Sequence, residues 1–133
     1  MDNRQINLNY TNIALELLMN EPSLQHIKES HAVIIYLESD YAKTSKGKLV
    51  FGQCEKVADK YKWGIPADFT ITVFEPNVQK FTEDQIRILL HHELLHVGID
   101  KKADGSESYS IVDHDIEDFK LILDKYGTDW SRS

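Results

Sequence analysis

Apolar residues recur at helical spacing near the start of the chain. In NYTNIALELLMN, the side chains of Ile13, Leu17 and Leu18 fall on one helical face. Pro22 then opens PSLQHIKES after a polar break, and proline is favoured at the first position of a helix. We therefore expect an N-terminal helical layer made of one helix and a second, short helical segment.

The pattern then changes to one typical of β-strands. HAVIIYLES is a short run rich in β-branched residues, as in a buried strand, and DFTITVFE alternates apolar residues with threonines, as in a half-buried strand. GKLVFGQCEKV follows a loop marked by lysine and glycine, and we expect it to pair with one of these two segments. The pattern predicts a small three-stranded sheet built from Ala32–Leu37, Leu49–Lys56 and Phe69–Phe74.

A second helical pattern follows Pro76. The stretch TEDQIRILLHHELLHVGI places five apolar residues at helical spacing: Ile86, Leu89, Leu90, Leu94 and Val97. Thr82 is a candidate N-cap with two acidic residues in the first turn, and Gly98 is well placed to end the helix. This predicts an amphipathic helix that carries three histidines near its end.

A loop and a last helix are expected at the end of the chain. DKKADGSESYS is polar and contains glycine, which is typical of a surface loop. VDHDIEDFKLILDKYG then predicts a helix with Asp113 as a candidate cap and Gly127 after its end. The combined pattern of helices and strands indicates the α+β class.

Length and composition favour one domain. The 133 residues, 41% of them hydrophobic, are enough for one core, and the chain has no internal repeat or Gly/Ser linker, so we expect residues 1–133 to form a single domain. No stretch approaches the roughly 20 apolar residues of a membrane span, and the start lacks the profile of a secretory signal. We expect a cytoplasmic protein. Cys54 is the only cysteine, so any metal must be held by histidine and carboxylate.

The candidate chemistry lies in LLHHELLHVGID. Residues four apart share one face of a helix, so His92 and His96 can direct ring nitrogens at one zinc ion (Zn²⁺). Glu93 lies beside them, where a carboxylate can take a proton from a metal-bound water. This is the general-base role in the H-E-x-x-H motif.

A simpler interpretation treats these histidines as polar side chains at the edge of an amphipathic helix. It must explain three histidines within six positions among leucines, where burial is costly without partners. We therefore favour the metal site. His91 points about 100° away from His92 around the helix, and we expect it to be packed or to support a ligand. His26 and His31 are expected to be structural.

The third metal ligand is expected in DHDIEDF. Catalytic zinc sites have three protein ligands and one open position. His114 is the first candidate because imidazole suits zinc, whereas Glu117 and Asp118 follow one turn later and could replace or support it. Tyr109, in the preceding predicted loop, could donate to an oxyanion, although an exposed loop residue is the simpler interpretation.

The distribution of charge is uneven. The net charge of −7 argues against strong binding to a phosphate backbone. Between Lys43 and Lys62, however, six lysines face only two acidic residues, which leaves a local nucleic-acid surface as an alternative to a solvated face.

The two motifs together give the chain a recognisable likeness. LLHHELLHVGID followed by HDIEDFKLILDKYG resembles the putative phage metallopeptidase family, small zincin-like proteins of phages and prophages. GKLVFGQCEKV and ADFTITVFE also resemble its paired strands, so the resemblance covers roughly residues 32–130 and leaves the N-terminal part, residues 1–31, outside it.

The resemblance implies a minimal zincin-like architecture in which a C-terminal helix brings the third ligand. It assigns metal to His92, His96 and His114 and the base to Glu93, but it implies no particular substrate. We expect a protein or peptide substrate and, for a phage-encoded protein, the host cytoplasm as location. The alternative from another class is a non-catalytic, zinc-stabilised module that binds a host complex. Glu93 argues against it, because a purely structural zinc site needs no acid beside its histidines.

Overall fold

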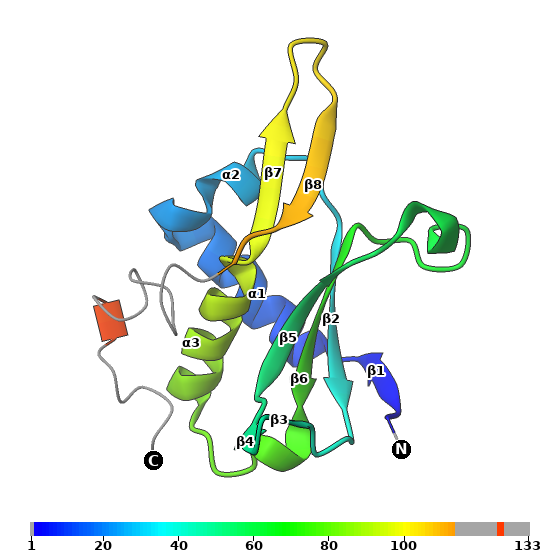
Figure 1. Ribbon diagram of the computed structural model, residues 1–133. Helices are drawn as coiled ribbons and strands as arrows, with labels where there is room; N and C mark the ends of the chain where they lie inside the picture. Colours follow the sequence, from blue (N-terminus) through cyan, green and yellow to red (C-terminus); the bar gives the residue numbers. More distant parts are fainter. Residues whose placement is uncertain (1, 114–124, 127–133) are drawn as a thin grey trace.

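The computed structural model describes residues 2–113 and 125–126. Figure 1 shows how the elements are arranged in space. The strands are β1 (Arg4–Ile6), β2 (Ile34–Ser39), β3 (Thr44–Ser45), β4 (Lys48–Leu49), β5 (Gly52–Lys56), β6 (Phe69–Phe74), β7 (Val97–Lys101) and β8 (Glu107–Ile111). The helices are α1 (Leu8–Asn20), α2 (Gln25–Lys28) and α3 (Glu83–Leu94), with 3₁₀ turns η1 (Pro22–Leu24), η2 (Asp59–Tyr61) and η3 (Glu75–Asn77). The α+β class is confirmed.

The main sheet has four strands in the described chain, in the order β1-β2-β6-β5. β2 and β6 are parallel, whereas β1 and β5 run antiparallel to their neighbours. The prediction of three strands was wrong by one, because β1 is only three residues long and all three are exposed. A segment this short and exposed has no alternation of apolar and polar residues from which a strand could be predicted.

The three predicted strands form the rest of this sheet. Phe69–Phe74 is observed with the predicted bounds, and the strand predicted at Ala32–Leu37 lies two residues later, at Ile34–Ser39. The third begins only at Gly52, because Lys48–Leu49 instead pairs with Thr44–Ser45 in a separate hairpin.

Both long helices cover one face of this sheet. Alternate residues of β6 (Phe69, Ile71 and Val73) join a single core with the buried sides of α1 and α3. The side chains of Ile13 and Leu17 in α1 are among them, as predicted from their helical spacing. The core therefore holds α3 against β5 and β6, and thereby fixes the position of its histidine-bearing end.

α3 begins as expected and ends earlier than expected. The Thr82 hydroxyl accepts a hydrogen bond from the Gln85 N–H while the Gln85 side chain accepts one from Thr82, which completes a capping box. The last helical residue is Leu94, so His96 lies in the turn that follows. Gly98 does not end the helix, because it already belongs to β7.

The segment predicted as a surface loop forms most of a hairpin instead. β7 and β8 pair antiparallel from Val97–Ile111 to Lys101–Glu107, and the hairpin projects from the body of the protein (Figure 1). The pairing reverses the chain and returns it toward the end of α3. The predicted final helix lies almost wholly outside the described residues, of which only Lys125 and Tyr126 belong to it, and both are helical.

In the part of the chain that the structure describes, no helix is long and apolar enough to cross a membrane.

Candidate metal centre and active site

His92 and Glu93 occupy the last turn of α3. Their side chains are 11% and 6% exposed, and the His92 Nε2 atom lies 3.9 Å from Glu93 Oε2. A carboxylate this deeply buried beside an imidazole is unusual on an amphipathic helix, since acidic side chains normally remain in water. The His92 and Glu93 side chains are therefore largely shielded from solvent, at the edge of the core.

His96 follows in the turn, and its ring lies against that of His92. The two ring centroids are 5.2 Å apart. The His96 Nδ1–H donates to the carbonyl of Val112, at 2.6 Å. Because a carbonyl only accepts, this bond makes Nε2 the basic nitrogen of the neutral ring, which is the arrangement usual for a metal-binding histidine.

A second bond ties the same two residues together. The Val112 N–H donates to the His96 carbonyl at 2.7 Å, so the pairing of β7 with β8 extends by one more residue pair. The hairpin thereby brings the chain back to His96 immediately before the segment predicted to supply the third ligand. A return of the chain was expected at this point, but by a loop and not by paired strands.

Gly52 in β5 lies close to the Glu93 side chain, a contact that was not predicted from the sequence. A Cβ atom at this position would lie 3.3 Å from Glu93 Cγ, from Glu93 Oε2 and from Leu89 Cδ1. The absence of a side chain lets the strand backbone come this near to the carboxylate without a tight contact. An isolated glycine within a strand pattern was the available signal.

Two other histidines make packing and hydrogen-bond contacts: His91, which was expected to be packed or to support a ligand, and His26, which was expected to be structural. His91 is fully buried, and its two ring nitrogens lie 3.0 Å from the Ser23 hydroxyl and 3.0 Å from the Tyr126 hydroxyl. His26 Nε2 donates to the Val97 carbonyl at 3.0 Å. These contacts connect the N-terminal helical layer to α3, to β7 and to the helical residues near the C-terminus.

Tyr109 is not an exposed loop residue. It lies half-buried in β8, where its hydroxyl donates to Glu107 at 2.9 Å and its ring packs edge-on against Phe69. Burial, together with the bond to Glu107, raises the pKa of Tyr109 to about 12. Its hydroxyl is thus occupied within the hairpin.

Cys54 lies on β5 near the same carboxylate. Burial raises the pKa of its thiol above the usual range, and the negative charges of Glu93 and Glu55 raise it further. The thiol is therefore neutral at physiological pH. It is packed against the core and shows no sign of a nucleophile.

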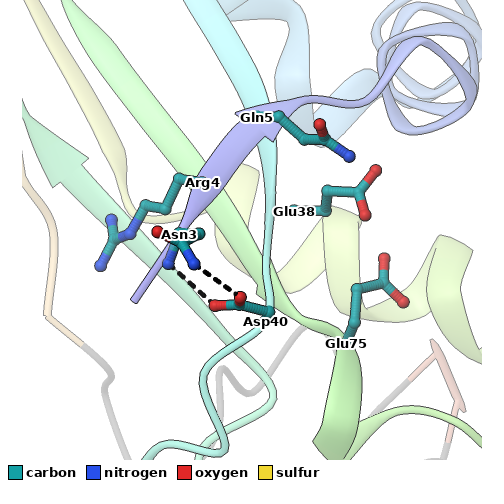
Figure 2. A pocket seen from close by; sticks show the side chains of 6 residues that line it. All are labelled: Asn3, Arg4, Gln5, Glu38, Asp40 and Glu75. Atoms are coloured by element: carbon teal, nitrogen blue, oxygen red, sulfur yellow. Dashed lines mark hydrogen bonds between the residues drawn. The ribbon is translucent and has the colours of Figure 1, made fainter. Parts of the chain in front are cut away.

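A pocket beside β1 is separate from these residues. A pocket of about 250 Å³ is lined by Asn3, Arg4, Gln5, Glu38, Asp40 and Glu75 (Figure 2). Its carboxylates hold elements together: Asp40 accepts from Asn3, Glu38 from the Asn7 amide, and Glu75 from the Tyr10 hydroxyl. None of the predicted site residues lines it.

Imidazole and carboxylate groups, which can bind zinc, lie at the end of α3, but the described residues do not contain a complete metal site. Across residues 2–113 and 125–126, no three side chains of the His, Cys, Asp or Glu type are grouped to hold an ion. The structure brings together His92, Glu93 and His96, whereas the predicted His114, with its alternatives Glu117 and Asp118, lies outside the described residues.

Comparison with known protein families gives a match over nearly the whole chain. A family model described as "Putative phage metallopeptidase" matches residues 6–133. The match includes the N-terminal helical layer, which the sequence motifs had left outside the resemblance. No curated protein and no solved structure gives a significant match.

Proposed function

Because the chain belongs to the phage metallopeptidase family, we propose that it is a zinc-dependent, zincin-like peptidase of phage or prophage origin that hydrolyses peptide bonds in a protein or peptide substrate. His92 and His96 are two of the metal ligands and Glu93 is the general base. The observation that carries this proposal is the juxtaposition of these three side chains in and after the last turn of α3.

The orientation of His96 supports its role as a ligand. Its Nδ1–H is held by the Val112 carbonyl, so the ring presents Nε2 in the tautomer that binds a metal. Two imidazoles and a neighbouring carboxylate are a donor set that zinc accepts in catalytic sites.

His114 is proposed as the third ligand because it follows Val112, which is bonded to His96, by only two residues. Val112 is bonded to His96 through two hydrogen bonds. A chain advances at most about 3.6 Å per residue, so two residues beyond Val112 span no more than roughly 7 Å. Glu117, five residues after Val112, is less constrained and remains the alternative.

The mechanism assigns proton transfer to Glu93. When bound, zinc polarises a carbonyl oxygen and lowers the pKa of water toward ~7. The Glu93 carboxylate accepts the proton of the attacking water and then delivers it to the amine that leaves. Its burial keeps bulk water away from this transfer, and the nearby β5 backbone restricts where the carboxylate can move.

The edge of the main sheet offers a place for the substrate. Among the residues that the structure describes, β5 pairs in this sheet on one side only, with β6, and its Gly52 lies directly beside Glu93. An extended peptide that paired with β5 would run past the carboxylate, a mode in which main-chain hydrogen bonds supply much of the affinity.

The test compares wild-type protein with Glu93→Gln on a diverse peptide library, after zinc loading. We expect wild type to generate new peptide termini, detected by mass spectrometry, and the amide variant to keep its metal but generate none. Glu83→Gln, which changes an exposed acid in the first turn of α3, is the matched control and should remain active. Equal hydrolysis by Glu93→Gln would refute the base assignment. A metal-loaded wild type without activity would favour a non-catalytic zinc module.

A further inference from the structure

The loop between β5 and β6 exposes large aromatic side chains. Trp63 is 90% exposed and Tyr61 52%, and Ile65 beside them is 39% exposed. Figure 1 shows this loop projecting from the sheet, with η2 near its tip. Trp side chains are on average highly buried in folded proteins. An almost fully exposed Trp beside an exposed Tyr therefore indicates a binding surface.

The aromatic residues are held in place by backbone hydrogen bonds. The N–H groups of both Gly64 and Ile65 donate to the Tyr61 carbonyl, at 3.1 and 3.0 Å. At the base of the loop, the Val57 N–H donates to the backbone carbonyl of Asp68 at 2.9 Å. The loop therefore presents its rings on a folded support and not on an extended chain.

Positive charge accompanies the aromatic residues. Of the six lysines in the stretch 43–62, Lys56, Lys60 and Lys62 lie at the end of β5 and in the loop, together with the acidic Glu55 and Asp59. Lys60 is exposed and places its Nζ atom 5.1 Å from the Tyr61 ring centroid. Lys56 is also exposed at the end of β5, whereas Lys62 is engaged by Asp68 at 3.0 Å. Lys46 and Lys48 are exposed at the β3–β4 hairpin, which lies at the other end of β5 from this loop (Figure 1).

We propose that this loop, with the lysines around it, binds single-stranded nucleic acid. Unpaired bases stack on exposed aromatic rings whatever their sequence, and lysines neutralise the phosphates between them. Trp63 supplies the main stacking surface, Tyr61 a second ring, and Lys56 and Lys60 the contacts to phosphate.

The same residues fit a membrane surface less well. Charged side chains alternate with the apolar ones through Asp59, Lys60 and Lys62, so the tip has no continuous apolar face to enter a bilayer. Base stacking needs only individual ring faces, and these charges do not obstruct it. This binding site is independent of the proposed peptidase activity.

The test measures binding of a fluorescently labelled oligonucleotide of about 16 thymidines, a length near the upper site size of such surfaces. Fluorescence anisotropy at low salt should show binding that weakens as salt rises, with a slope of about −0.7 for each phosphate neutralised. Trp63→Ala should weaken binding about tenfold or more, and Trp63→Phe should retain most of it. A uridine oligomer in parallel distinguishes RNA from DNA as the preferred strand.

Charge variants and an intrinsic probe complete the experiment. Lys60→Gln should reduce the salt slope by about 0.7, whereas Lys28→Gln, an exposed lysine on α2, should leave it unchanged. In a Trp130→Phe background Trp63 is the only tryptophan, and its fluorescence should be quenched by the oligomer. The proposal fails if the wild type binds no oligomer at low salt, if Trp63→Ala binds as wild type does, or if the loop binds anionic vesicles in preference to nucleic acid.

Discussion

At the scale of single residues, Gly52 controls how closely β5 approaches the proposed base. Replacing it with Ala would place a methyl group 3.3 Å from two atoms of Glu93 and from Leu89. We expect Gly52→Ala to destabilise the protein by about 1–3 kcal/mol, as overpacking does, and to reduce hydrolysis because Glu93 must shift. Metal binding should survive, since neither of the two proposed ligand histidines is touched. Urea denaturation and activity assays measure the two effects.

Gly64→Ala is the matched control for this substitution. A Cβ atom at Gly64 would meet no heavy atom within 4 Å, so its effect on stability should be below about 0.5 kcal/mol. Gly52→Ala with the stability and activity of wild type would show that the close approach has no role.

Cys54 gives a second prediction at this scale. Burial and the nearby carboxylates raise the pKa of its thiol, and only the thiolate attacks an aromatic disulfide reagent. We expect the native protein to react much more slowly than the urea-unfolded chain at mildly alkaline pH, as followed by absorbance. Equal rates in the two states would contradict the burial of this thiol.

Sequence patterns predicted the packing of some individual residues but not their contacts with distant parts of the chain. The packed role of His91 was predictable because its position on the helix differs from that of His92. The contact of Gly52 with Glu93 was not, because it joins residues far apart in the chain through the pairing of β5 with β6.

At the scale of elements, the β7–β8 hairpin determines where the chain returns to His96. A Cβ atom at Gly98 would lie 2.5 Å from the Ser110 Oγ and 3.0 Å from the Ser110 carbonyl oxygen. We expect Gly98→Ala to disturb the pairing of the two strands and, through Val112, to weaken zinc binding. Thermal unfolding and a zinc competition titration would record both effects.

Ser110→Ala provides a partial rescue of this variant. It removes the hydroxyl that clashes at 2.5 Å but leaves the backbone contact, so the double variant should recover part of the stability. If Gly98→Ala bound zinc with wild-type affinity despite a weakened hairpin, the tether through Val112 would have no part in the site.

The boundaries of elements were the least predictable feature. The helical pattern of apolar residues continues to Val97, yet α3 stops at Leu94, because β7 begins at Val97 and buries that residue by strand pairing. The β7–β8 hairpin was not predicted from the sequence for a related reason, namely that it depends on strand pairing. Its turn and β8 are rich in Ser, Glu and Asp, and their pairing is visible only once the chain has folded back.

At the scale of the whole molecule, the fold class and the three main strands followed from periodicity, because the core face of β6 and the buried sides of both helices repeat regularly. The fourth strand did not follow, because its pairing is decided by β2 and not by its own composition. Most of the core thus forms without any contribution from the proposed metal ligands.

Chelation should therefore weaken the protein without unfolding it. Zinc that binds the folded state selectively raises the melting temperature by mass action, and its removal reverses this gain. We expect a chelator to lower the melting temperature while the circular dichroism spectrum remains that of a folded α+β protein. Complete unfolding would indicate a structural zinc site, and an unchanged melting temperature would indicate no native site.

A zinc competition titration tests most directly whether the end of α3 is a metal site. Wild-type protein should bind one zinc ion, and both His92→Ala and His96→Ala should abolish that binding. His31→Ala, which changes an exposed histidine outside the site, should bind as wild type does. His114→Ala should weaken binding severely, whereas Glu117→Ala should cost at most about 10- to 100-fold. Wild-type affinity in either the His92 or the His96 variant would contradict the account.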